Sequence, residues 1–213
     1  MSMSSDTILV TDKDVERIEK QLFGQYISKE NYLRWHKKYS EWLFSDANEL
    51  SVDSALKDPI KYYCGFGFSI LKENILGIDS HHTNSYKTLL TLCSQKLDYW
   101  VNEAPTLKQD MYVFRAVKKD EFDELKKNKF KQYPSFLSTT IIDDPKKVLE
   151  TFGKEYILKI LVPKNSKCAY VKELVSTGQE RELEVIFPKG MELQVFKRHY
   201  FSKNELECVL HIG

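Results

Sequence analysis

Two glutamates near the end of the chain are spaced for shared chemistry. Glu182 and Glu184 belong to the run 182–187, in which apolar and polar residues alternate with the period of a β-strand. Neighbours on one face of a strand lie about 6.6 Å apart, so both carboxylates would serve one cavity. One carboxylate could stabilise a cation while the other handles a proton. Taken alone, the pair more often belongs to a strand whose polar side simply faces water.

Two earlier segments carry further polar groups. The run 112–117 has the pattern of a strand that is apolar on both faces, with Arg115 in its middle. A buried arginine needs an anionic partner and grips phosphate through paired hydrogen bonds, although an edge-strand arginine that reaches solvent fits as well. The run 136–140 ends a strand with three hydroxyl residues, beginning at Ser138. A serine there either orients a carboxylate on a neighbouring strand or satisfies the backbone at a turn.

The order of these motifs resembles the mono-ADP-ribosyltransferases of the arginine–serine–glutamate branch, a group with many bacterial toxins. The resemblance covers the second half of the chain, and the aromatic-glycine run 63–70 and the run 74–77 extend it into the first half. It implies an α+β fold, in which a helical N-terminal half packs on a mixed or antiparallel β-sandwich core of the ADP-ribosyltransferase type.

The resemblance also implies a role for each motif residue, with NAD as the substrate. Arg115 would hold the NAD phosphates, Ser138 would hydrogen-bond and aim Glu184, and Thr139 would support the nicotinamide end. Glu184 would bind the nicotinamide ribose and stabilise the oxocarbenium-like cation as nicotinamide leaves. Glu182 would orient and deprotonate the acceptor, for which a protein arginine is favoured.

The loop 172–181, with Ser176, Gly178 and Gln179, would meet the target. It carries Val175 where many related toxins have an aromatic residue, so the resemblance defines the reaction more closely than the acceptor. Three alternatives therefore accompany the main reading. They are transfer to RNA or DNA by a toxin of a toxin–antitoxin or phage-related system, hydrolysis of NAD to water, and a catalytically inactive binding module.

Composition limits the other possibilities. A chain of 213 residues suits one domain, with residues 1–104 mainly helical and 105–213 forming a mainly β, NAD-binding core. The formal net charge of +1 provides no overall basic field for nucleic acid or membrane. The lysine-rich run 118–131 also holds four acidic residues and is interpreted as a solvated helix. A monomer is expected, because no exposed heptad pattern is present.

No metal site is expected. The four cysteines are far apart and are interpreted as reduced thiols, and His81 and His82 fit a polar loop. The segment 1–6 is polar without a signal peptide, and no apolar run approaches the ~18 residues that span a bilayer. We therefore expect no membrane partner and action in a cytoplasm, either the producer's or that of a cell the protein is delivered into. An antitoxin or immunity protein is a reasonable partner for an active transferase.

Elements are expected to be segregated along the chain. In the first half, Thr11 can cap a helix, an aromatic stripe marks a second helix around residues 32–43, and the strongest helical pattern covers Asn84–Asn102. From residue 111 the pattern switches to strands. The expected strands are Tyr112–Val117, Ser135–Thr140, Tyr156–Val162, Ala169–Lys172, Glu182–Phe187, Glu192–Tyr200 and Glu205–Ile212.

Overall fold

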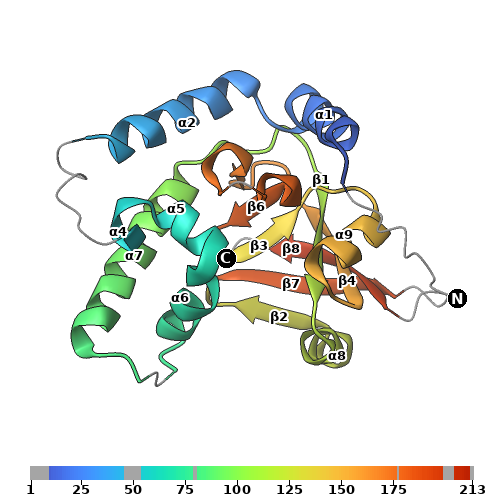
Figure 1. The fold of residues 1–213 in the computed structure, drawn as a ribbon. Coiled ribbons are helices and arrows are strands. Elements are labelled where there is room, and N and C mark those ends of the chain that lie inside the picture. The colour runs from blue at the N-terminus through green and yellow to red at the C-terminus, as the bar shows by residue number, and fades with distance from the viewer. Residues whose placement is uncertain (1–9, 46–53, 79–80, 177, 199–203, 212–213) are drawn as a thin grey trace, which may run out of the picture.

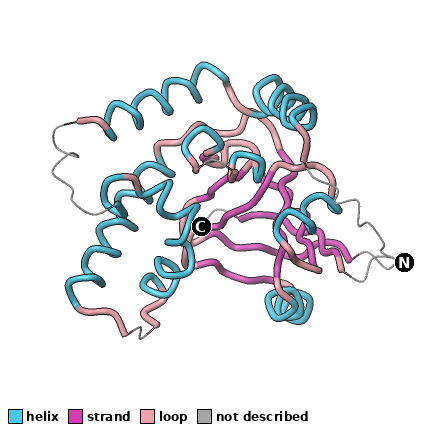
Figure 2. The backbone as a smooth tube through the Cα atoms, in the orientation of Figure 1, coloured by secondary structure: helices cyan, strands magenta, loops and turns pink. Residues whose placement is uncertain are grey.

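The fold was obtained as a computed structural model, which describes residues 10–45, 54–78, 81–176, 178–198 and 204–211 (Figure 1). Helices of the first half flank a sheet built from the second half, as Figure 2 shows with helices in cyan and strands in magenta. The expected α+β class is confirmed. The polar segment 1–6 and the ends of the last two expected strands, residues 199–200 and 212, lie outside the described residues.

The helices begin where their capping residues stand. Thr11 caps the first helix by accepting from the Asp14 N–H, which confirms the expected cap. Thr83 caps the helix over Asn84–Asn102 in the same way, with the expected bounds. The helices are α1 (Asp12–Gln21), α2 (Lys29–Leu43), α4 (Ser54–Lys57), α5 (Pro59–Tyr62), α6 (Phe68–Ile75), α7 (Asn84–Asn102), α8 (Lys119–Asn128) and α9 (Pro145–Phe152), with π-helical turns η1 (Leu22–Tyr26) and η2 (Tyr63–Gly67).

The aromatic stripe of α2 forms the core of the helical part. Tyr32, Trp35 and Tyr39 are all buried, as a helix with an apolar face against its neighbours requires. The Trp35 indole donates to the carbonyl of Trp100 on α7 at 3.0 Å, so α2 and α7 are joined by a buried hydrogen bond. The Tyr39 hydroxyl donates to Asp58 at 2.7 Å and accepts from the Ile60 N–H at 3.3 Å, which joins α2 to the start of α5.

The second half forms one mixed sheet in the order β2-β7-β8-β4-β1-β3-β6-β5. Only the pairing of β4 with β8 is parallel among these neighbours. The strands are β1 (Met111–Val117), β2 (Phe130–Tyr133), β3 (Leu137–Thr140), β4 (Tyr156–Val162), β5 (Ala169–Tyr170), β6 (Glu184–Phe187), β7 (Met191–Arg198) and β8 (Glu205–His211).

The sheet is weakly joined between β1 and β3. β1 pairs with β4 over seven positions, whereas its register with β3 is one pair, Phe114 with Thr140. The backbone of β3 beyond that pair is therefore not bonded by β1, and it can accept hydrogen bonds from side chains. This division of the sheet lies beside Arg115 and Ser138, so it sets the location of the candidate site.

Two expectations about the strands were wrong. β2 was not expected, because residues 130–131 fell within the run interpreted as a solvated helix. In the structure α8 ends at Asn128. Lys129 then takes a left-handed φ of 71°, which turns the chain into β2. The strand expected from Glu182 begins at Glu184. Within the described residues, no helix is both long and apolar enough to cross a bilayer.

We predict that Tyr39→Phe lowers the free energy of unfolding by about 1–3 kcal/mol, because the Ile60 N–H and the Asp58 carboxylate lose a buried partner. Urea unfolding followed by circular dichroism measures the change. Tyr99→Phe is the matched control, since the Tyr99 side chain is exposed, and it should leave stability unchanged. Equal stability of the two variants would contradict the structural role of the Tyr39 hydroxyl.

Candidate active site

Three of the residues singled out in the sequence meet at the division of the sheet. Arg115, Ser138 and Glu184 come from the neighbouring strands β1, β3 and β6. Arg115 Nη1 donates to the carbonyl oxygen of Ser138 at 2.7 Å, and Ser138 Oγ donates to Glu184 Oε1 at 2.5 Å. The register explains the second contact, because Thr140 stands opposite Glu184 and Ser138 lies two residues from Thr140 on the same face.

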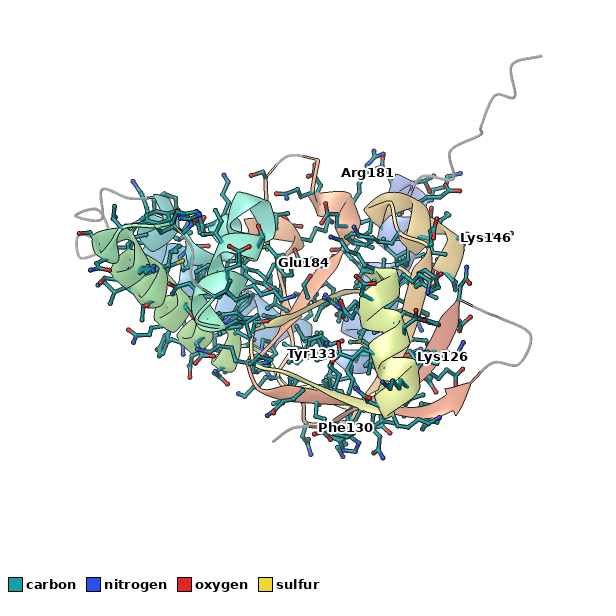
Figure 3. The ribbon with its side chains drawn as sticks, turned by 90° about the horizontal axis from the view of Figure 1, so that it is seen from below. Lys126, Phe130, Tyr133, Lys146, Arg181 and Glu184 are labelled. Carbon is teal, nitrogen blue, oxygen red and sulfur yellow. The ribbon has the colours of Figure 1, made fainter. Side chains whose placement is uncertain are left out.

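Glu184 is a buried carboxylate with three compensating interactions. Its side chain is in the interior of the molecule, whereas Arg181 lies at the edge (Figure 3). Burial raises the pKa of Glu184, while hydrogen bonds from Ser138 and from the Cys64 thiol and the nearby charge of Arg115 act to lower it. The net effect is a pKa above the ordinary value. The donors therefore offset only part of the cost of ionising this buried carboxyl, and the pKa of Glu184 would be higher without them.

Glu182 does not share the strand with Glu184. It ends the 3-10 turn η4 (Glu180–Glu182), and Leu183 takes a left-handed conformation with φ of 46° before β6 begins. The Leu183 side chain is fully buried in this conformation, and the alternation expected through residue 182 ends at this point. The Glu182 backbone is held by Thr140, whose Oγ1 donates to the Glu182 carbonyl at 2.6 Å.

The Glu182 carboxyl nevertheless remains electrostatically coupled to the site. Burial, and secondly the negative charge of Glu184, raise the pKa of Glu182 to about 7. A carboxyl with this pKa exchanges a proton near neutral pH, as a general base should. The two carboxylates are thus distinguished by their surroundings, which is typical of sites that assign different roles to them.

Thr139 lines a small pocket together with Arg115 and Ser138. Its side chain points to the opposite face of β3 from Ser138, because successive residues of a strand alternate. Its hydroxyl donates to the Val185 carbonyl at 3.2 Å and is buried there. A role of Thr139 at the nicotinamide end stays a prediction.

The predicted target loop is attached to the helical half. Gln179 Nε2 donates to the carbonyl of Cys64 at 2.7 Å, and the Gln179 N–H donates to the Ser176 carbonyl at 3.0 Å. Gly178 is exposed and has a φ of 98°, a left-handed conformation that favours glycine. Cys64 belongs to η2, so η2 and the loop lie side by side near Glu184.

Two residues that contact the cluster were not anticipated. Cys64 lies in the helical half, and no spacing in the sequence relates it to Glu184. Glu121 accepts a hydrogen bond from Arg115 Nε at 3.1 Å, although its run was interpreted as solvated. One signal could have revealed it: Glu121 lies four residues before the buried Leu125 and so shares the inner face of α8. All four cysteines are free, as expected.

The arrangement suits stabilisation of a positive charge that develops beside a bound anion. Glu184 is a preorganised carboxylate, and two of the five N–H donors of Arg115 are used by Ser138 and Glu121 in the described part of the chain. Its remaining donors can serve a phosphate. Among the described residues, no group of three or more histidine, cysteine, aspartate or glutamate side chains could hold a metal ion.

The fold, together with a serine-held glutamate beside an arginine, agrees with the resemblance to the ADP-ribosyltransferases. The family model for the ADP-ribosyltransferase exoenzymes matches residues 10–211, and the chain belongs to that family. It is accordingly an NAD-dependent mono-ADP-ribosyltransferase. No curated protein matches the sequence.

Solved toxin structures share the fold at low sequence identity. BECa, an ADP-ribosylating toxin of a binary enterotoxin of C. perfringens solved with NADH, is 17% identical with a TM-score of 0.62 over 93% of this chain. This chain spans only 48% of BECa. Plx2a, an ADP-ribosyltransferase toxin from Paenibacillus larvae, is 14% identical with a TM-score of 0.60 over 93% of this chain and 97% of Plx2a. The C3 exoenzyme of Clostridium limosum is 13% identical with a TM-score of 0.56, over 88% and 97% of the two chains.

We predict that Glu184→Gln lowers the pKa of Glu182 from about 7, because it removes the repulsion by a neighbouring charge and leaves burial as the main cause of the shift. Titration of the Glu182 side-chain carboxyl by ¹³C NMR measures both midpoints. Glu173→Gln, a change at an exposed residue of the same region, should leave the midpoint in place. A midpoint that stays near 7 in Glu184→Gln would show that the two carboxyls are not coupled.

Proposed function

We propose that the protein transfers ADP-ribose from NAD to the guanidinium of an arginine in a target protein. The observation that carries the proposal is the pairing of a serine-held, buried Glu184 with a second carboxyl, Glu182, whose pKa is about 7. One group suits a developing cation and the other suits a proton near neutral pH.

In the first step, the bond between the ribose C1′ and the nicotinamide nitrogen breaks, and nicotinamide leaves as a neutral molecule with the bonding electrons. Arg115 binds the phosphates, which positions the ribose against Glu184. The Glu184 carboxylate stabilises the positive charge that develops on the ribose, and Ser138 keeps that carboxylate oriented. No acid catalyst is needed, because the leaving group already carries the positive charge in NAD.

In the second step, a guanidinium nitrogen of the acceptor attacks C1′ and gives up a proton to Glu182. A guanidinium is a poor nucleophile while it is fully protonated, so the step requires a base close to the acceptor. The choice of a protein arginine follows from charge. Two neighbouring carboxylates attract a cationic side chain and repel the phosphates of a nucleic acid.

The loop with Ser176, Gly178 and Gln179 is the proposed contact with the target. Gly178 is exposed and lies one residue from Gln179, which is itself tied to Cys64. This tie supports a loop that is held in place close to Glu182 and meets the target as a preformed surface.

We predict that Glu184→Gln reduces both NAD hydrolysis and transfer by about a thousandfold, because the charge that stabilises the cation is lost. Glu182→Gln should retain hydrolysis and lose transfer by a similar factor, because water needs no help from a base aimed at the acceptor. Nicotinamide release and incorporation of labelled ADP-ribose measure the two reactions. Glu155→Gln, at an exposed residue just before β4 and outside the target loop, is the matched control and should keep both activities. Full transfer activity in Glu182→Gln would reject its role as base.

Transfer should also rise as the pH is raised through about 7, because Glu182 accepts a proton only in its ionised form and its pKa lies there. The rate of NAD hydrolysis should not show this rise, because hydrolysis does not need Glu182 as a base. Initial rates of both reactions between pH 5.5 and 8.5 test the assignment, with constant-ionic-strength buffers. A transfer rate that falls over this interval would contradict a basic role for Glu182.

The acceptor class is decided by treating a cell lysate with labelled NAD and the protein, followed by protease or nuclease. Label that is removed by protease and resists nuclease supports a protein acceptor, and mass spectrometry then shows whether arginine is modified. Label that is removed only by nuclease would reject the proposal in favour of a nucleic-acid acceptor. Free ADP-ribose without any labelled macromolecule would identify an NAD glycohydrolase.

A further inference from the structure

The helix α8 contributes one acidic side chain to the interior. Glu121 Oε1 accepts from Arg115 Nε at 3.1 Å and also from the Tyr133 hydroxyl at 2.7 Å. The side chains of Arg115 and Glu121 are 14% and 19% exposed, so the pair is largely shielded from water. The small contribution that exposed ion pairs make to stability is therefore not the right comparison for Arg115 and Glu121.

The electrostatic balance of the group favours the ionised pair. Burial acts to raise the pKa of Glu121, but the charge and hydrogen bonds of Arg115 and Tyr133 outweigh it, and the pKa is lowered. The charge of Lys72 on α6 acts in the same direction. Burial acts to lower the pKa of Arg115, and Glu121 more than offsets this, so the pKa of Arg115 is raised.

The contacts fix the orientation of the guanidinium plane. Glu121 holds Nε, the Ser138 carbonyl holds Nη1, and the guanidinium carbon lies 5.8 Å from the centre of the Tyr133 ring. A planar group held at two separate nitrogens has no freedom to rotate about its long axis. The direction of the remaining N–H donors is therefore set by Glu121 and Ser138 together.

We propose that Glu121, held by Tyr133, is a positioning residue that aims Arg115 at the pyrophosphate of NAD. The inference rests on the proposed function, in which Arg115 binds these phosphates. Tyr133 is buried at the end of β2, and Figure 3 shows its label beside α8. Glu121 binds the guanidinium at Nε, so it orients the cation and leaves other N–H donors of Arg115 for the phosphates.

The test separates the two halves of the substrate. ADP-ribose carries the pyrophosphate and is not consumed, whereas nicotinamide carries no phosphate. Isothermal titration calorimetry measures the Kd for ADP-ribose, and inhibition of NAD hydrolysis measures the Ki of nicotinamide. Glu121→Ala should raise the Kd for ADP-ribose about tenfold, as expected for one member of a coupled network, with Ki of nicotinamide and kcat unchanged.

Two milder variants keep the test valid should Glu121→Ala not fold. Glu121→Gln retains an oxygen that accepts from Arg115 and Tyr133, so it should restore most of the affinity. Tyr133→Phe keeps the ring and removes the donor to Glu121, and should raise the Kd by about threefold. Glu124→Gln is the matched control one turn along α8, where Glu124 pairs with Lys131 near the surface, and it should bind ADP-ribose normally.

A double-mutant cycle shows whether Glu121 acts through Arg115. Adding Glu121→Ala to Arg115→Ala should weaken ADP-ribose binding no further than Arg115→Ala does alone. Additive losses of affinity in the double variant would overturn the positioning role alone. The same conclusion would follow if Arg115→Ala bound ADP-ribose weakly while the Glu121 variants bound it at least as tightly as the unchanged protein. Normal binding by Arg115→Ala would instead overturn the phosphate-binding role in the proposed function, and the present inference with it.

Discussion

Arg115 must keep its charge in a largely buried position, and the structure around it follows from that requirement. A guanidinium removed from water needs acceptors on several sides. They come from different elements: a carboxylate of α8, a backbone carbonyl of β3 and the ring of Tyr133 at the end of β2. The weak pairing between β1 and β3 makes the Ser138 carbonyl accessible for this purpose. The Arg115 guanidinium thereby connects β3, at the weak pairing of the sheet, with α8, the helix that follows β1.

The two glutamates illustrate how neighbours in sequence acquire separate roles. Glu184 starts β6 and faces Ser138, whereas Glu182 ends a 3-10 turn before the left-handed Leu183. The reversal lets Leu183 fill the core while both carboxyls stay within electrostatic reach of each other. Burial raises the pKa of both carboxyls, but hydrogen bonds oppose the rise at Glu184, whereas the charge of Glu184 adds to it at Glu182 and brings the Glu182 pKa to about 7. This difference is what an enzyme needs to stabilise a cation and to accept a proton in the same cavity.

The helical half takes part in the site. Cys64 on η2 accepts from Gln179 through its carbonyl, and its thiol acts to lower the pKa of Glu184, so it connects the proposed catalytic carboxylate with the proposed target loop. Burial raises the pKa of the Cys64 thiol well above its usual value, which keeps it a donor and makes it a poor nucleophile. The aromatic core of α2 and α7 supports this region through Tyr39 and the start of α5. Stability of the first half and geometry of the site are therefore linked.

The sequence by itself determined the segregation of helices and strands, the cap at Thr11, the bounds of α7 and the order of Arg115, Ser138 and Glu184, because these depend on local periodicity and on residue type. Tertiary structure decided the rest. Glu121 and Cys64 reach the site through contacts between distant elements, which no local pattern records. Glu182 lies outside the expected strand, because the conformation and burial of Leu183 depend on the packed sheet. Packing also decided that one acidic residue of a lysine-rich helix would face an arginine in the interior rather than water.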